Sequence, residues 1–457
     1  RAVAKFGFVE IGELGGWIEK EENLSHEENA WVYGDAKVYG NAKVYGNAEV
    51  RDKAEVCGNA IVYGNAKVGE NAKVQDKAEV CGNAIVYGNA KVGEDAEVYD
   101  NAEVCGNVIV FGNAKVRGKA EVCGNAIVCD NAKVGENAEV YGKALIYGDA
   151  KVYGNAKVYG NAKVGEDAEV YDKAEVYDKA EVYGNAQIYG NAIVRANAKV
   201  YGNAEVCGKA GVGGKAEIRD DAKVYDKAIV CEDANVYGKA QIYGDAKVWY
   251  DAKVYGNAEV CGKAEVRGKA EIRDDANVYG NANVYGNANV YGNAKIYGNA
   301  KVYDNAKVWD DAKVYDNAEV CGNAKVWYDA KVYGNAKVYS NAEVYSNAKV
   351  YGNAKVYGNA EVCGKAEVCG KAEVFSTRHV LVIGTIGSQD DFATFYRDKD
   401  NEITVKCGYF LDKIDKFLEK VTETHGDSNY ALVCRAAVEA ARLQIDLSNE
   451  VTKDADE

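Results

Sequence analysis

The sequence predicts an all-β solenoid, and two regularities indicate it. From Val32 to Val374 an aliphatic residue recurs at every sixth position without insertion or deletion, which makes 58 consecutive units such as Ala-Lys-Val-Tyr-Gly-Asn. An alanine precedes each aliphatic residue by two positions, except where Val108 replaces it. This alternation is typical of a β-strand rather than a helix, so the alanine and valine of each unit are expected to face inward.

Residues 1–29 precede the first regular unit and are expected to form an irregular first coil or cap. Ile18 and Leu24 keep the six-residue spacing but fall in the register of the alanines rather than that of the valines. The ends of a solenoid present strand edges that attract other chains unless something covers them. We therefore expect this segment to be an end structure that differs from the repeat.

Each unit of the repeat, residues 30–375, ends in a two-residue turn. Pairs such as Gly40-Asn41 and Asp52-Lys53 follow the outward residue, and these residue types tolerate a positive φ or bond to their own backbone. A strand that buries one alanine and one valine is not stable alone, so neighbouring units must stack on a continuous core. The absence of proline agrees, because nearly every N–H in such a stack donates to a neighbouring coil.

The unit from Val38 to Lys43 resembles the motif of hexapeptide-repeat left-handed parallel β-helices at both core positions, although tyrosine replaces the usual small residue after valine. Residues 12–19 and 23–27 are similar to the start of bacterial and prophage repeat proteins labelled as acyltransferases. The first resemblance covers residues 30–375 and implies left-handed triangular coils of three hexapeptides, or 18 residues. About 19 coils at a spacing of ~4.8 Å predict a rod on the order of 90 Å long.

An 18-residue coil places outward residues above one another in columns. Identical side chains one coil apart stack as in cross-β assemblies. Two interpretations remain open: the stack stabilises the sheet, with less than ~1 kcal/mol for each pair, or it is an aromatic platform for glycans or partner rods. The candidate stacking ladder comprises Tyr279, Tyr297, Tyr315, Tyr333 and Tyr351.

A second column carries apolar residues where charged ones are usual. Ile109, Ile127 and Leu145 occupy three successive coils of this column. An exposed apolar patch of this kind is unusual on a soluble monomer, so we interpret it as a protein-contact surface, with neutral drift of the repeat as the alternative. The candidate contact comprises Ile109, Phe111, Ile127, Cys129, Leu145 and Tyr147. A further candidate of the same kind comprises Ile193, Gly211 and Ile229.

Eleven of the thirteen cysteines follow a core valine or isoleucine, and only Cys105 and Cys123 share a column one coil apart. Their expected Cα separation of ~4.8 Å lies in the disulfide range, so this pair is the candidate disulfide. A wider disulfide framework is not expected. We interpret the other cysteines as small substitutes for tyrosine in a reducing compartment, or as bridges between rods.

The six-residue period stops after Phe375, and residues 376–457 predict a small α+β domain. Period-2 alternation predicts three strands, and helical spacing predicts two helices with Gly426 as the stop signal between them. The predicted strands cover residues 379–385, 392–397 and 403–410, and the predicted helices cover residues 411–424 and 429–445.

Composition excludes several classes of partner. The net charge of −15 argues against nucleic acid or an anionic membrane, and no apolar run reaches the roughly 20 residues that span a bilayer. No zinc-type cluster of cysteine and histidine occurs, so neither a metal nor another cofactor is expected. The compartment stays open: extracellular or at the surface if the protein is a filament, cytoplasmic if its unpaired cysteines are reduced.

The hexapeptide acyltransferases that the repeat resembles use a histidine base and loops that interrupt the coils. This chain has only His26, His379 and His425, none of them inside the repeat, and no coil carries a loop. A thiol site of Cys407, His425 and Asp427 matches no defensible motif. We therefore expect no enzyme activity.

The expected function is structural: a self-assembling, bacterial or phage-borne rod that forms filaments or fibres. Head-to-tail contacts between the first coil and the C-terminal domain would generate an open polymer of this chain. Two alternatives remain open, an acyltransferase-like trimer and a glycan-binding adhesive fibre that uses the outward tyrosine columns. Ice binding is disfavoured because the repeat contains no threonine.

Overall fold

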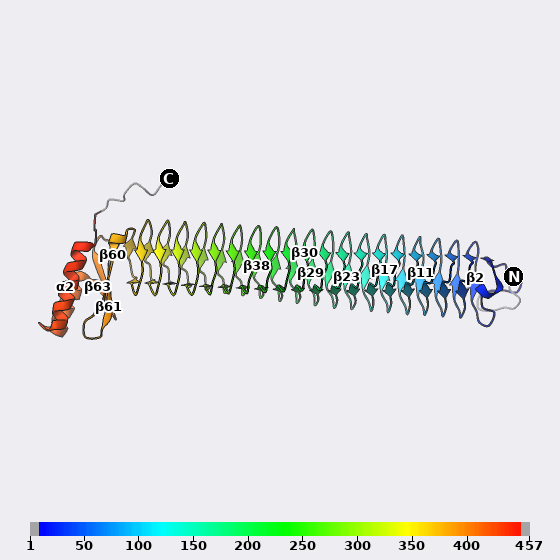
Figure 1. Cartoon of the computed structure of the whole chain (residues 1–457), viewed down its shortest axis with the longest axis horizontal. Coiled ribbons are helices and arrows are strands. Elements are labelled where there is room, and N and C mark those ends of the chain that lie inside the picture. The colour runs from blue at the N-terminus through cyan, green and yellow to red at the C-terminus, as the bar shows by residue number, and fades with distance from the viewer. Residues whose placement is uncertain (1–8, 449–457) are drawn as a thin grey trace. The chain divides into compact units, whose positions relative to one another are not determined.

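The computed structural model describes residues 9–448, and the chain divides into two compact units, Arg1–Glu232 and Asp233–Glu457. The first unit holds the N-terminal coils, and the second holds the other coils and a small C-terminal domain (Figure 1). The predicted parallel β-solenoid is confirmed in each unit. Within residues 9–448, neither helix has the length and apolar character that crossing a bilayer requires.

The repeat forms 58 strands of two residues each, one in every six residues, from β2 (Trp31–Val32) to β59 (Glu373–Val374). Within each of the two compact units, a strand of the repeat pairs in parallel with the strand three places later in the sequence. For example, β3 (Lys37–Val38) pairs with β6 (Glu55–Val56), and Val38 lies beside Val56. Three strands therefore complete the predicted coil of 18 residues, and the coils of both units number about 20.

Alternation along each strand places the alanine and valine columns inside. Ala36 and Val38 are fully buried, and so is Val108, which interrupts the alanine column. The backbone of each coil bonds to the next: the N–H of Tyr39 donates to the carbonyl oxygen of Val56 at 3.0 Å. Strands above and below satisfy the backbone N–H and carbonyl groups of each coil. A core of small alanine and valine side chains is therefore sufficient to hold the stack.

The turns require a residue in the left-handed region of φ. Gly40 has a φ of 71°, and Asp52 takes the same position with a φ of 62°. An aspartate here also reaches the next coil, since the N–H of Glu70 donates to Oδ2 of Asp52 at 2.9 Å. This charge-assisted hydrogen bond offsets part of the strain that a side chain incurs at positive φ.

The first coil is irregular because it contains two extra residues. In β1 (Trp17–Ile18), Ile18 pairs with Val38, and Leu24 lies beside Val44, so both pairs are 20 residues apart rather than 18. The regular spacing begins where Val32 pairs with Val50. The sequence register of Ile18 and Leu24 was therefore misleading: insertion of two residues before Val32 brings both side chains into the valine column.

Gly16 and a short 3-10 helix fix this first coil. The N–H of Gly16 donates to the carbonyl oxygen of Val32 at 2.7 Å, and a Cβ on Gly16 would lie 2.5 Å from the carbonyl oxygen of Ala36. Only glycine allows that approach. In η1 (Glu21–Asn23), the side chain of Asn23 donates to the carbonyl oxygen of Ala42 at 2.8 Å. The segment is thus tied to the coils beside it by backbone-directed hydrogen bonds.

Up to residue 448, the C-terminal domain of the second unit contains four strands, where the sequence predicted three. Gly408, with a φ of 53°, reverses the chain so that Phe410 pairs with Cys407, and the first predicted helical residues form a strand instead. The sheet is antiparallel in the order β60-β61-β62-β63. Its elements are η2 (Thr377–His379), β60 (Val380–Ile386), β61 (Asp391–Arg397), β62 (Ile403–Cys407), β63 (Phe410–Lys413), α1 (Ile414–His425) and α2 (Asn429–Gln444).

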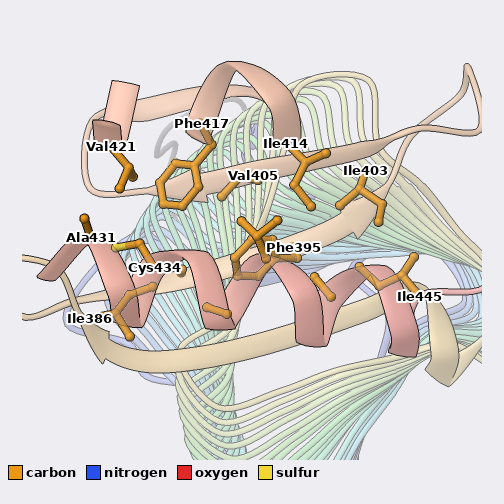
Figure 2. Packing of buried hydrophobic residues seen from close by; sticks show 14 residues of the cluster. Ile386, Phe395, Ile403, Val405, Ile414, Phe417, Val421, Ala431, Cys434 and Ile445 are labelled. Carbon is orange, nitrogen blue, oxygen red and sulfur yellow. The ribbon is translucent and has the colours of Figure 1, made fainter. Parts of the chain in front are cut away.

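Both helices pack on one face of this sheet. Phe395 and Val405 point from the strands toward Phe417 of α1 and Cys434 of α2 (Figure 2). Phe395 and Phe417 meet edge to face with ring centroids 6.2 Å apart. Val438 on α2 is also fully buried, so this cluster is a second hydrophobic core that is separate from the alanine and valine columns.

Candidate interaction surfaces

The predicted tyrosine ladder is present in the second unit. The ring centroids of Tyr279, Tyr297 and Tyr315 are 4.9 and 4.8 Å apart, with planes within 3° of parallel. Tyr333 and Tyr351 continue the stack at 4.8 Å for each step. Since each inner ring has a neighbour on both faces, these rings present their edges rather than their faces to solvent.

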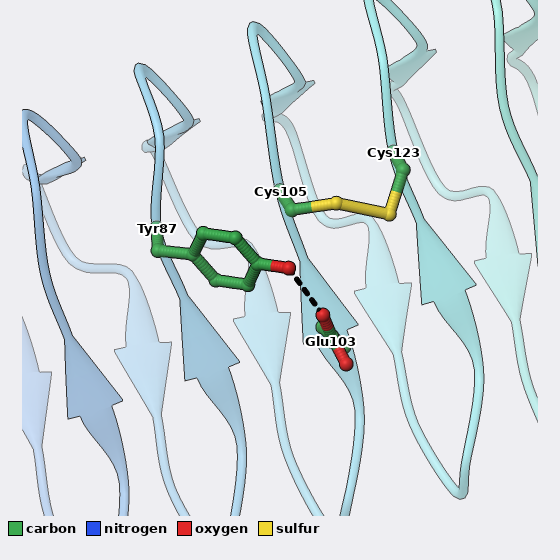
Figure 3. Close-up of a disulfide and its surroundings, with 4 residues drawn as sticks. All are labelled: Tyr87, Glu103, Cys105 and Cys123. Atoms are coloured by element: carbon green, nitrogen blue, oxygen red, sulfur yellow. Dashed lines mark hydrogen bonds between the residues drawn. A yellow bond between two sulfur atoms is a disulfide. The ribbon is translucent and has the colours of Figure 1, made fainter.

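Many tyrosine hydroxyls bond to a carboxylate of the next coil. The hydroxyl of Tyr351 donates to Oε2 of Glu367 at 3.2 Å, and that of Tyr87 donates to Oε1 of Glu103 at 2.5 Å (Figure 3). The hydrogen bond to Glu103, together with burial, raises the pKa of Tyr87 to about 12. Burial first, and then neighbouring tyrosines, raise the pKa of Tyr297 to about 12. Tyr87 and Tyr297 are thus protonated and neutral at physiological pH.

The candidate contact in the first unit is assembled in register. Ile127 pairs with Ile109 on one side and with Leu145 on the other, and all three side chains are half-buried. The inclusion of Cys129 as an exposed member was wrong: it is only 7% exposed, because its thiol packs toward the carbonyl oxygen of Ile146, 3.7 Å away. Stacking on adjacent coils therefore covers much of this apolar surface without a partner.

The ring of Tyr147 requires a glycine, Gly165, one coil further on. A Cβ on Gly165 would lie 1.9 Å from Cζ of Tyr147, so the tyrosine ring lies directly over the glycine. Phe111 is half-buried as well. The other candidate patch is more open, since Ile229 is 43% exposed beside Gly211, with Ile193 on the far side of that glycine.

A disulfide joins Cys105 and Cys123, whose Cα atoms are 4.7 Å apart (Figure 3). It links adjacent coils of one sheet and closes a loop of one full coil. The other eleven cysteines are free thiols.

The C-terminal domain covers the last coils of its own unit, a contact that the sequence did not predict. The hydroxyl of Tyr396 donates to the carbonyl oxygen of Cys369 at 3.1 Å, and the N–H of Glu367 donates to Oγ1 of Thr394 at 2.9 Å. Thr394 and Tyr396 alternate with Phe395, which faces the helices, so β61 is buried on both faces. The run from Phe392 to Tyr396 contains no charged residue, so neither face of β61 is marked as solvent-exposed, and this is the signal that sequence reasoning missed.

A buried histidine lies at the same junction. The ring of His379 meets that of Phe375 edge-on, with centroids 4.1 Å apart, and its Nδ1 accepts from the N–H of Phe375 at 3.2 Å. The guanidinium of Arg397, on β61, lies 4.6 Å from the centroid of the Phe375 ring. Burial first, and then the charge of Arg397, lower the pKa of His379 to about 4. The histidine is therefore a buried, neutral residue at pH 7.

Cys407 and His425 line a cavity of about 430 Å³ in the C-terminal domain, but no thiol triad forms there. Asp427 pairs instead with Arg435, whose Nη1 lies 3.2 Å from Oδ1. Burial raises the pKa of Cys407 to about 11, so its thiol is protonated at neutral pH and a weak nucleophile. Among residues 9–448, no three His, Cys, Asp or Glu side chains are placed to bind one metal ion.

Apolar side chains are exposed at the N-terminal end of the first unit. Ile11 is 71% exposed, Leu14 67% and Trp17 54%. Trp17 belongs to β1, which pairs only with β3 within the described residues. We call Ile11, Leu14 and Trp17 the N-terminal edge.

These observations define a β-solenoid repeat protein with a capped C-terminal end. A family model described as the YdcK beta-solenoid repeat matches residues 186–202, which include β28 (Gln187–Ile188), β29 (Ile193–Val194) and β30 (Lys199–Val200). The match is a similarity to the repeat over about three hexapeptides. No curated protein matches the chain.

Proposed function

We propose that this protein is a structural β-solenoid that associates end to end with copies of itself. The observation that carries the proposal is the difference between the two ends. The last coils of the second unit are covered by β61, whereas the first coil carries the exposed N-terminal edge, on a strand that pairs only with β3 within residues 9–448. An exposed strand edge with apolar side chains is a site that other chains bind.

The covered C-terminal end changes how head-to-tail association would work. Tyr396 and Thr394 of β61 cover the last coils. The N-terminal edge of another copy would therefore meet the outer surface of the C-terminal domain rather than an open strand. A heterologous contact of this kind propagates into an open polymer, which is a filament or fibre.

Two alternatives make different predictions. An acyltransferase-like trimer requires a base and a cleft in the coils, whereas the repeat has no loop and no histidine. A glycan-binding fibre requires open ring faces, whereas the inner rings of the ladder are stacked on both faces. Both features support a non-catalytic, structural role over these alternatives.

Negative-stain microscopy and light scattering over a concentration series test the proposal. We expect the wild-type chain to form filaments whose length increases with concentration. Replacing both Leu14 and Trp17 with serine should abolish them, whereas Ile85→Ser, at a residue 38% exposed on the side of the repeat, should not. Compact trimers, or filaments that survive the double substitution, would exclude the end-contact model.

A further inference from the structure

Helix α2 is apolar on two opposite faces. One face carries Ala431, Cys434, Val438 and Ala441, each at most 3% exposed, and packs on the sheet and α1 (Figure 2). The other carries Leu432, Val433, Ala436, Ala440 and Leu443, all of them exposed.

The exposed residues form one continuous stripe. Leu432, Ala436, Ala440 and Leu443 follow one another at helical spacings of four, four and three residues, and Leu432 and Leu443 are 54% and 83% exposed. We call these four residues the outer stripe of α2. A helix that is apolar on both faces is normally buried on both, which indicates a further packing partner.

We propose that the outer stripe of α2 binds the outer stripe of a second copy of this chain, with the two helices antiparallel. The stripe has the same order of large and small residues in both directions: leucine, alanine, alanine, leucine. In an antiparallel pair centred near residue 438, Leu432 lies beside Leu443 of the partner subunit, and Ala436 beside Ala440 of the partner subunit. Such a self-complementary patch is what a two-fold interface requires. The central alanines allow the helix axes to approach closely.

The charges beside the stripe are of both signs. Arg435, Glu439 and Arg442 lie along one edge of the stripe at helical spacing. With a rise of ~1.5 Å per residue, the antiparallel pair brings both Glu439 and Arg442 within ~3 Å, along the axis, of Arg435 of the partner subunit, so each Arg435 meets one opposite and one like charge. Within one chain Arg442 pairs with Asp415 at 2.9 Å and with Glu439 at 3.3 Å. Arg435 pairs with Asp427 at 3.2 Å, so the pairs across the interface would form by exchange of these exposed partners.

Residues 449–457, which follow the described range, match the stripe less well in composition. Residues 449–457 contain five charged residues and a single large aliphatic one, Val451. They offer no second row of leucine and alanine to match the stripe. A second α2 supplies that row.

This pairing is independent of the proposed filament contact. It uses α2 rather than the N-terminal edge, and it predicts assemblies with an even number of chains whether or not rods polymerise. If both contacts form, the pairing links two filaments through their C-terminal domains.

Sedimentation equilibrium of the full chain tests the pairing, with the Leu14→Ser and Trp17→Ser substitutions present to suppress end-to-end growth. We expect a dimer in this background, and Leu443→Glu should weaken it at least tenfold. Leu411→Glu, at a residue 46% exposed in the same domain but outside α2, should leave the dimer unchanged. A monomeric parent, or equal dimerisation of the parent and Leu443→Glu chains, would overturn the proposal, and neither result bears on the N-terminal edge.

Cysteine cross-linking tests the orientation separately. Chains with Ala436→Cys should cross-link efficiently with chains that carry Ala440→Cys, and each variant alone should do so less well. The wild-type chain is the control, because it already contains thirteen cysteines. Preferential linking of Ala436→Cys to itself would indicate a parallel pair and would contradict the antiparallel arrangement.

Discussion

The hydroxyl of Tyr396 donates a hydrogen bond to the carbonyl oxygen of Cys369 at 3.1 Å, and this contact joins the C-terminal sheet to the last coils of the solenoid. The sulfur of Cys369 lies 3.4 Å from the same hydroxyl. Both residues are at most 1% exposed. The domain is therefore held by a specific polar contact in a buried interface. Loss of one hydrogen-bond partner there costs free energy of folding, because the other group is left buried and unsatisfied.

Replacing Tyr396 with phenylalanine should loosen this interface. The substitution leaves the carbonyl oxygen of Cys369 without its hydroxyl donor and should cost about 1 kcal/mol. Native-state hydrogen exchange of β61 and of the last coils measures the effect. Tyr409→Phe is the matched control, because Tyr409 is fully exposed, and equal exchange rates in the two variants would contradict this role for Tyr396.

Acid should loosen the same junction. The pKa of His379 falls from an ordinary 6.5 to about 4 in the folded protein, so between these values the unfolded state binds more protons than the folded state. Stability should therefore decrease as the pH falls from about 6.5 toward 4. Limited proteolysis across this range should release the domain at low pH, and His379→Phe should flatten the pH dependence. An unchanged slope in that variant would assign the effect to other groups.

Alkali should unfold the ladders, because here the folded state binds more protons than the unfolded state. Tyr297 and Tyr333 have folded pKa values of about 12 against an ordinary 10, chiefly because they are buried. The folded state thus retains protons that the unfolded state loses, and stability should decrease as the pH rises from about 10 through 12. Circular dichroism, together with tyrosinate absorbance, should show ionisation and loss of strand structure in one transition. Tyrosinate absorbance that rises fully near pH 10 while the fold persists would contradict this account.

Removing the disulfide should destabilise the first unit. Cys105 and Cys123 close a loop with a sequence separation of 18, which the chain-entropy model values at about 3 kcal/mol. The Cys105→Ser, Cys123→Ser double variant should unfold at lower denaturant concentration than the oxidised protein, and it should match the chemically reduced one. Cys231→Ser, at a free thiol of the same unit, serves as the control. Identical midpoints for the double variant and the oxidised protein would mean that the link does not constrain the unfolded state.

The parts of this fold that repeat could be predicted from the sequence, because one local rule recurs in every unit. Ala36 and Val38 face inward by simple alternation, and the 18-residue coil that the resemblance to hexapeptide-repeat β-helices implies then aligns Tyr297 with Tyr315. The same rule placed Cys105 beside Cys123.

The parts that do not repeat depend on contacts between distant segments. Nothing in the local pattern of β61 indicates that Thr394 meets the backbone of Glu367, 27 residues away. The two extra residues before Val32 have no periodic signature, and the turn at Gly408 divides what looked like one continuous strand and helix. Cys129 shows the same limit, because its burial depends on how neighbouring coils pack.

The docking of β61 on β58 (Glu367–Val368) and β59 gives the second unit a direction of unravelling. A solenoid coil contacts only its neighbours, so thermal fraying or mechanical peeling starts at a coil whose outer side is open. Tyr396 and Thr394 of β61 hold the terminal coils of this unit like a clasp, and the separate hydrophobic core of the C-terminal domain lies behind β61. Tension on the C-terminal helices therefore acts first on the clasp, and the coils behind it unwind one at a time only after it has opened.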